Sequence, residues 1–311
     1  MTKNKLLELL EKEQTQELTH KDIVKLRSYN DESIDIILNS KYKNIMIEII
    51  SNQEFKSLPQ NTQNEIINIL NNSESEEKAL AIYYVVRSGL ILSSGLTLEI
   101  IKIITNTNSS IASYIVNTAI NPSVLINSNI IEILKIISKS KEEYQASSAS
   151  DIAKDLNVIV SEKILELIKI ASETIGEEKS RLVNNIAKNK DILISDLSIE
   201  LTTLASKTNL SESINLINEI ASNKILEKNR LSKYYLIDML FAKSNEEVEE
   251  IYKQAQIKIT TLKKQESTIK KDTSLFWNVY KKNPQEAILS LIDINSEQEI
   301  TEYTRIRTNK K

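Results

Sequence analysis

The sequence predicts an all-α protein, a right-handed superhelix of about six helix–turn–helix repeats of about 34 residues each. The first observation behind this prediction is a stretch at 112–119 that recurs at 146–153 and again at 180–187. The second is the shortage of turn formers, with three glycines and three prolines in 311 residues. The third is a content of hydrophobic residues of 41%, dominated by Ile and Leu, which suffices for a continuous core.

The repeat divides the chain into three parts. A helical cap is expected at 1–44, and a second helical cap with a basic tail is expected at 250–311. The solenoid between them has the predicted units 45–78, 79–111, 112–145, 146–179, 180–213 and 214–249.

Each unit is expected to contain two helices. In the clearest unit the first helix runs from Ala112 to about Ile120 and ends at Asn121, because a residue before proline is pushed out of the α region. A short connection with the apolar pair Val124 and Leu125 follows, and this pair recurs in the neighbouring units. The second helix is expected to begin at a Ser or Asn that serves as its N-cap, namely Ser94, Asn127, Ser161 or Ser195.

Alanine recurs at one position of the first helices. The residues are Ala119, Ala153, Ala187 and Ala221. A helix position that must stay small allows a neighbouring helix to approach closely, so we expect these alanines to be buried between consecutive units.

The C-terminal part reads as three further helices. Ser244 and Glu247 form a capping-box pattern ahead of a long charged helix that is expected to reach about Lys264. A shorter helix is expected around Trp277, and another one begins after Asn283. The residues from Arg305 onward are expected to form a frayed basic tail.

Over roughly 45–241, the unit length and helix pairing resemble the tetratricopeptide and HEAT-like class of α-solenoids. The Trp, Leu-Gly and Tyr of the tetratricopeptide pattern are absent from matching positions, so no peptide-binding residue is carried over. The resemblance implies an extended surface that binds another macromolecule.

Composition argues against most kinds of chemistry. The chain has no cysteine, one histidine (His20) and no glycine-rich phosphate loop, so we expect no catalytic residue, no cofactor and no metal. The first residues are charged and lack the apolar core of a secretory signal, and no stretch is apolar enough to span a membrane. We therefore expect a cytoplasmic protein without a membrane partner.

Net charge is unevenly distributed along the chain. It is −5 over 1–77, −2 over 78–249 and +4 over 250–311. HEAT-like DNA-repair glycosylases are the alternative class, but they need a basic concave face to bind the phosphate backbone. A repeat region with net charge −2 does not favour nucleic acid as the partner.

A glutamate recurs on each second helix, followed three residues later by lysine in the central units. We call the resulting set the Glu–Lys track: Glu99, Lys102, Glu132, Lys135, Glu166 and Lys169. The track is either a solvated polar stripe or a surface that docks a partner. Trp277, among lysines, either seals the last repeat or contacts a partner.

These observations predict a non-enzymatic scaffold that binds a protein or an extended peptide along one face of the solenoid. The two alternatives are the nucleic-acid-binding repeat protein and a purely structural or self-assembling module.

Overall fold

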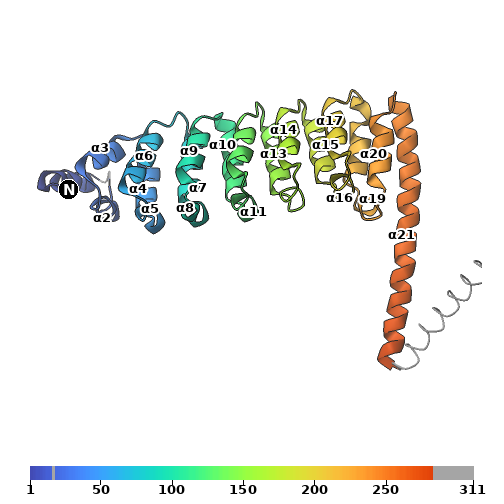
Figure 1. The fold of residues 1–311 in the computed structure, drawn as a ribbon. Helices are drawn as coiled ribbons and strands as arrows, with labels where there is room; N and C mark the ends of the chain where they lie inside the picture. Colours follow the sequence, from blue (N-terminus) through green and yellow to red (C-terminus); the bar gives the residue numbers. More distant parts are fainter. Residues whose placement is uncertain (16–17, 283–311) are drawn as a thin grey trace, which may run out of the picture. The chain divides into compact units, whose positions relative to one another are not determined.

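A computed structural model describes residues 1–15 and 18–282, with side chains to residue 267 and at 278 and 281. All regular structure in the described residues is helical, with 21 α-helices and one short 3₁₀ helix. The all-α class is therefore confirmed. The chain divides into one unit at 1–249 and a second at 250–311 (Figure 1).

The first unit opens with α1 (Lys3–Gln14), α2 (His20–Leu26) and α3 (Asp31–Asn39). Thereafter a first and a second helix alternate along the chain, as Figure 1 shows. The first helices are α4 (Lys43–Ser51), α7 (Glu76–Arg87), α10 (Ser109–Ala119), α13 (Glu143–Lys154), α15 (Glu177–Lys188) and α18 (Ile214–Ala221), the last preceded by η1 (Ser211–Ser213). The second helices are α6 (Gln60–Asn71), α9 (Thr97–Thr105), α12 (Ile130–Ser138), α14 (Ile164–Glu173), α17 (Ser198–Lys207) and α20 (Ser232–Leu240).

Short connector helices join most of these pairs. They are α5 (Gln53–Lys56), α8 (Gly89–Ser94), α11 (Pro122–Leu125), α16 (Lys190–Leu193) and α19 (Lys224–Lys228). They lie together along one edge of the array, at the bottom of Figure 1, and we call this the connector edge. A turn takes the place of the connector helix between α13 and α14.

First helices pack against first helices and second helices against second helices, so the array has two layers. The recurring alanines of the first layer are buried, as predicted: Ala119, Ala153, Ala187 and Ala221. The apolar pair that recurs in the connections is buried as well, for example Val124 with Leu125 and Ile192 with Leu193. Burial of these positions in successive units gives one continuous core.

Polar side chains also join consecutive units. The Gln145 amide donates to the Thr174 carbonyl at 3.0 Å, and the Ser148 hydroxyl donates to the Ser180 carbonyl at 3.0 Å. The amide of Asn189 donates to the Ala221 carbonyl at 3.0 Å. All three donors are buried, so these bonds satisfy carbonyl groups that water does not reach.

The first helices begin earlier than the sequence predicted. Asn108 caps α10, so that helix begins at Ser109 and not at Ala112. Likewise α13 begins at Glu143 and α15 at Glu177. Several predicted unit boundaries therefore fall inside helices, because the residues of the first turn do not repeat in sequence.

The predicted N-caps of the second helices are wrong. The N-cap residues are Leu96, Asn129, Lys163 and Leu197, and none of their side chains caps the helix. The predicted residues lie two positions earlier and shape the preceding turn. Asn127 accepts from the N–H of Asn129, and Ser161 accepts from the N–H of Lys163.

The C-terminal prediction also needs correction. The helix that begins after Ser244 is α21 (Asn245–Lys282), one continuous helix without a break near Lys264. Ser244 accepts from the N–H of Glu247 as predicted, but the Glu247 carboxylate accepts from Lys243. The helix and tail predicted after Asn283 lie outside the described residues.

Candidate functional site

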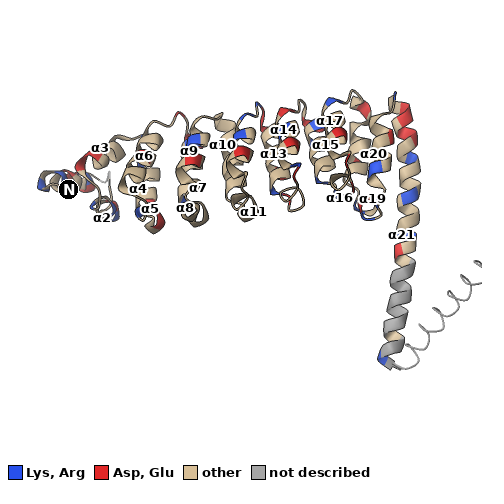
Figure 2. Cartoon of the chain, viewed as in Figure 1, with Lys and Arg blue, Asp and Glu red and all other residues tan. Residues whose placement is uncertain are grey.

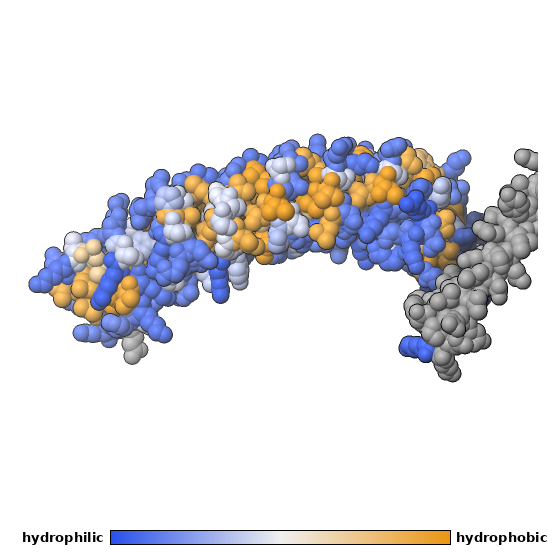
Figure 3. All heavy atoms as spheres, turned by 60° about the horizontal axis from the view of Figure 1, so that its bottom comes forward, coloured by the Kyte–Doolittle hydropathy of each residue, from blue (hydrophilic) through white to orange (hydrophobic). Residues whose placement is uncertain are grey.

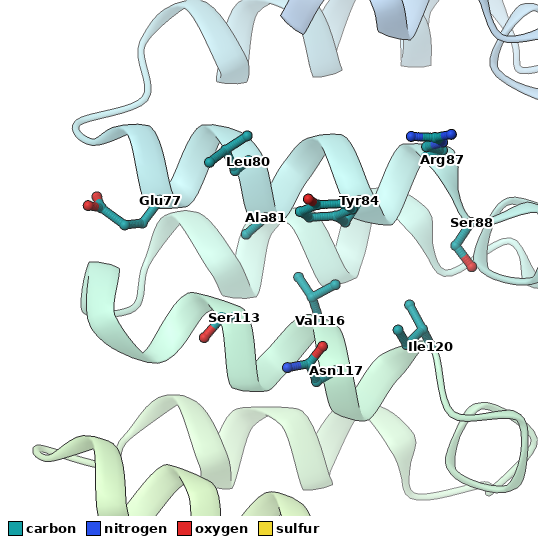
Figure 4. A pocket seen from close by; sticks show the side chains of 10 residues that line it. All are labelled: Glu77, Leu80, Ala81, Tyr84, Arg87, Ser88, Ser113, Val116, Asn117 and Ile120. Atoms are coloured by element: carbon teal, nitrogen blue, oxygen red, sulfur yellow. The ribbon is translucent and has the colours of Figure 1, made fainter.

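An apolar depression lies between two neighbouring first helices, α7 and α10 (Figure 4). Its volume is about 580 Å³, and we call it the tyrosine groove. Helix α7 and the connector residue after it contribute Glu77, Leu80, Ala81, Tyr84, Arg87 and Ser88. Helix α10 and its C-cap contribute Ser113, Val116, Asn117 and Ile120.

The groove exists because large side chains stand beside small ones. Leu80 and Tyr84 lie one turn apart on α7 and are exposed. Opposite them, α10 presents the small Ser113 and the buried Val116, so nothing from α10 covers the Tyr84 ring (Figure 4). Ile120 closes the end of the groove near the connector.

Later junctions between first helices carry hydrogen bonds between side chains at the part of the helix where the α7–α10 junction has the groove. The Thr118 hydroxyl lies 2.7 Å from the Ser150 hydroxyl, across α10 and α13. Arg181 of α15 donates to Asn215 of α18 at 2.6 Å. Between α7 and α10, the side-chain bond found among the described residues joins Ser75 to Ser109 at 2.8 Å, at the helix starts. The middle of the α7–α10 junction is therefore left open and apolar.

The two ends of the groove carry opposite charges. Glu77 stands at the start of α7, where hydrogen bonds from its own backbone N–H and from the Ser75 hydroxyl hold the pKa of its carboxyl below the usual value. Arg87 stands at the other end and donates to the Tyr83 hydroxyl at 3.0 Å. The guanidinium also lies 5.8 Å from the Tyr83 ring centre, which fixes its position beside the groove.

Known proteins add nothing to this picture. The chain matches no protein-family model, no curated protein and no solved structure. Interpretation of the groove therefore depends on its own geometry and chemistry.

The Glu–Lys track lies on the second helices, in the other layer of the array. All six side chains are exposed, and acidic and basic positions adjoin on helix after helix in Figure 2. Within each helix the glutamate and the lysine of the track do not form an ion pair. Lys102 instead reaches back to Glu65 on α6, with 2.8 Å between ammonium and carboxylate. The other five track side chains form no ion pair within the described part of the chain.

A row of exposed aliphatic side chains marks the connector edge. Ile126, Val160 and Ile194 recur at the repeat interval and are 85%, 82% and 68% exposed. Figure 3, in which this edge comes forward, shows apolar side chains gathered along the array. The row was not predicted from the sequence, because only the buried apolar pair that precedes each of these residues was recognised as a repeat.

Two further residues singled out in the sequence are Trp277 and His20. The structure describes Trp277 as part of α21 but does not describe its side chain. His20 is exposed at the start of α2, 3.7 Å from the Glu13 carboxylate. Among the described residues, no three His, Asp or Glu side chains come close enough together to hold a metal ion. No helix in the described part of the chain has the length and apolarity needed to cross a membrane.

Proposed function

We propose that the array is a non-enzymatic scaffold that binds polypeptide, with the tyrosine groove as its main anchoring site. The observation that carries this proposal is the exposed pair Leu80 and Tyr84 above an open apolar floor. Tyrosines at the centre of such depressions commonly supply most of the binding free energy in protein complexes. We further propose that the array is a right-handed superhelix of six units of about 34 residues.

The groove defines the size and chemistry of the bound segment. Glu77 and Arg87 are separated by ten residues of α7, or about 15 Å along the helix axis, the length of four or five residues of extended chain. A segment with an apolar side chain at its centre, a cation near Glu77 and an anion near Arg87 complements this surface.

The nucleic-acid alternative has less support. A duplex lying along the second helices would meet the exposed carboxylates Glu99, Glu132 and Glu166. Affinity for a phosphate backbone depends on an excess of cations at the contact, and here each lysine of the track has a glutamate neighbour.

Peptide selection tests the proposal directly. Random peptides displayed on phage are selected for binding to the full chain. The affinity of the selected peptides is then measured for the wild type and for Tyr84→Ala. We expect Tyr84→Ala to weaken binding by about tenfold or more, because the ring supplies the largest apolar contact area in the groove. Charge-reversing Arg87→Glu should alter which peptides are selected.

Tyr234→Ala is the matched control, since Tyr234 is exposed to the same extent (56% against 53% for Tyr84) but lies on α20, away from the groove. It should leave the affinities unchanged. Selected peptides that bind Tyr84→Ala as tightly as the wild type would show that the groove is not the binding site.

A further inference from the structure

A second depression lies on the connector edge, between α16 and α19, and it is lined by cations. Its volume is about 660 Å³, within the range of small-molecule sites. Lys190, Lys224, Lys228 and Arg230 contribute positive charge to its lining. We call it the cationic pocket.

The two carboxylates in the lining already have partners. Asp191 is buried, accepts from the N–H of Lys233 at 3.3 Å and lies 3.8 Å from the Lys233 ammonium. Glu227 accepts from the N–H of Lys190 at 2.7 Å and from the Lys224 ammonium at 2.9 Å. Neither carboxylate is paired with the side chain of Lys190 or Arg230.

Lys190 and Arg230 are left without counter-charges. Both side chains are exposed, and neither forms an ion pair or a side-chain hydrogen bond within the described residues. Cations that share one depression repel each other, and a bound anion would relieve that repulsion.

At the pocket, the exposed residues of the connector edge change from aliphatic to cationic. The exposed position that holds Ile126, Val160 and Ile194 is occupied by Lys228 in the last unit. Two positions further on, the earlier units hold Ser128, Glu162 and Asp196, two of them acidic, and the last unit holds Arg230. In Figure 3 the apolar patches give way to hydrophilic surface toward the end of the array that carries α16 and α19. A polar cap would need only solvent-exposed polar side chains, whereas here an acidic position has become cationic.

Arg230 has a backbone conformation that argues against a purely structural role. Its φ is 56°, and it is the one non-glycine residue with positive φ in the described chain. The N–H groups of Arg230 and Leu231 close the end of α19 by bonding to Glu227 and Leu226. Glycine is preferred at such a position, so an arginine there retains local strain in exchange for its guanidinium.

From these observations we propose that the cationic pocket binds a phosphate group, either of a free phosphorylated small molecule or of an anionic lipid headgroup. Lys190 and Arg230 contact the phosphate oxygens, and the arginine can donate two parallel hydrogen bonds. Ile194 also lines the pocket, and its exposed side chain would contact the apolar part of a lipid.

Two probes distinguish the sources. Inorganic pyrophosphate, titrated by calorimetry into the full chain, represents a free phosphate compound. Co-sedimentation with mixed phosphatidylcholine and phosphatidic acid vesicles, against pure phosphatidylcholine vesicles, represents the headgroup. Binding of pyrophosphate supports the pocket as a phosphate site, and binding confined to the mixed vesicles assigns the phosphate to lipid. Failure of the wild type to bind either probe overturns the proposal.

The variant series uses the strained backbone. Arg230→Gly removes the cation and relaxes the backbone, so its thermal midpoint should rise while probe binding falls. Together with Lys190→Gln, the loss should be on the order of tenfold or more. Lys139→Gln removes an exposed charge on another unit and should bind as the wild type does. Equal binding by the double variant and the wild type, or an equal loss in Lys139→Gln, would overturn the proposed site.

This site is independent of the tyrosine groove. The double variant should bind the selected peptides with unchanged affinity, and Tyr84→Ala should bind the phosphate probes normally. Either proposal can therefore fail alone.

Discussion

At the scale of single residues, Tyr29 shows how one buried polar group couples two parts of the array. Its ring is 4% exposed, and its hydroxyl donates to the Gln63 side chain of α6 at 3.1 Å. The Gln63 amide in turn donates to the carbonyls of Lys56 and Leu58. One chain of hydrogen bonds thus joins the residues after α2 to the turn before α6.

Burial of Tyr29 makes stability depend on pH at the alkaline end. Loss of solvation raises the pKa of its phenol from 10.0 to about 12. The folded state therefore favours the neutral phenol, and this contribution is complete below pH 10 and is lost as pH rises through about 12. The free energy of unfolding should fall over this interval.

Tyr29→Phe should remove most of that dependence on pH. At neutral pH it should cost about 1 kcal/mol, because Gln63 loses its partner while the ring remains. Urea unfolding at several pH values measures both effects. Tyr234→Phe, on an exposed ring, is the control. An equally steep alkaline loss in Tyr29→Phe and in the wild type would contradict the assignment to Tyr29.

At the scale of elements, the polar residues ahead of the second helices do not cap those helices, and one of them, Asn127, connects two units. Asn127 accepts from Asn129 within its own turn and donates to the Ile159 carbonyl of the next unit at 3.0 Å. The aligned Ser161 makes only the local bond, to the N–H of Lys163. A comparison of substitutions at Asn127 and Ser161 therefore separates the contribution of the bond between units from that of the local bond.

Asn127→Ala should lower the free energy of unfolding by about 1–2 kcal/mol, and Ser161→Ala by about 0.5 kcal/mol. The difference is the contribution of the bond that crosses between units, and urea unfolding of both variants gives it. Equal losses would mean that the crossing bond contributes nothing.

The sequence predicts these elements unevenly. Alanines and the Ile-rich second helices repeat because packing between units constrains them, so burial of Ala153 could be predicted. Helix starts could not be located, because the aligned first-turn residues, such as Ser109 and Glu143, differ from unit to unit. The continuity of α21 was readable, since no glycine or proline lies between Ser244 and Pro284.

The tyrosine groove was not predicted from the sequence, because its residues do not repeat from unit to unit. A search for repeated residues finds what the units share, whereas Leu80 and Tyr84 are where one unit departs from the others. The later first helices place Ser147 and Asp151 at these positions. An apolar pair at positions that are polar in neighbouring units was the available signal.

At the scale of the whole molecule, the part of the chain at 1–249 presents three chemically different surfaces. The groove is apolar with charged ends, the Glu–Lys track is mixed in charge, and the connector edge changes from apolar to cationic. In a two-layered array each element contacts mainly its neighbours, so a substitution on one surface has little effect on another. Binding at each surface can thus be tested separately.

The Glu–Lys track remains a candidate for a second contact with a long polypeptide. The double variant Lys102→Glu with Lys135→Glu reverses two charges on neighbouring second helices. Its thermal midpoint should stay close to that of the wild type, because the pair formed by Lys102 and Glu65 is half exposed and contributes at most about 1 kcal/mol.

If the track binds polypeptide, peptides selected on the full chain should include a set that carries both charges. Binding of that set should fall with added salt and in the double variant, but not in Tyr84→Ala, because exposed charge pairs are screened and the groove lies in the other layer. Lys21→Glu with Lys56→Glu, at exposed positions on α2 and α5, gives the same change in net charge away from the track and should have no effect. Should every selected peptide depend on Tyr84 and none on Lys102 and Lys135, the track would be a solvated face, and the groove alone would anchor the partner.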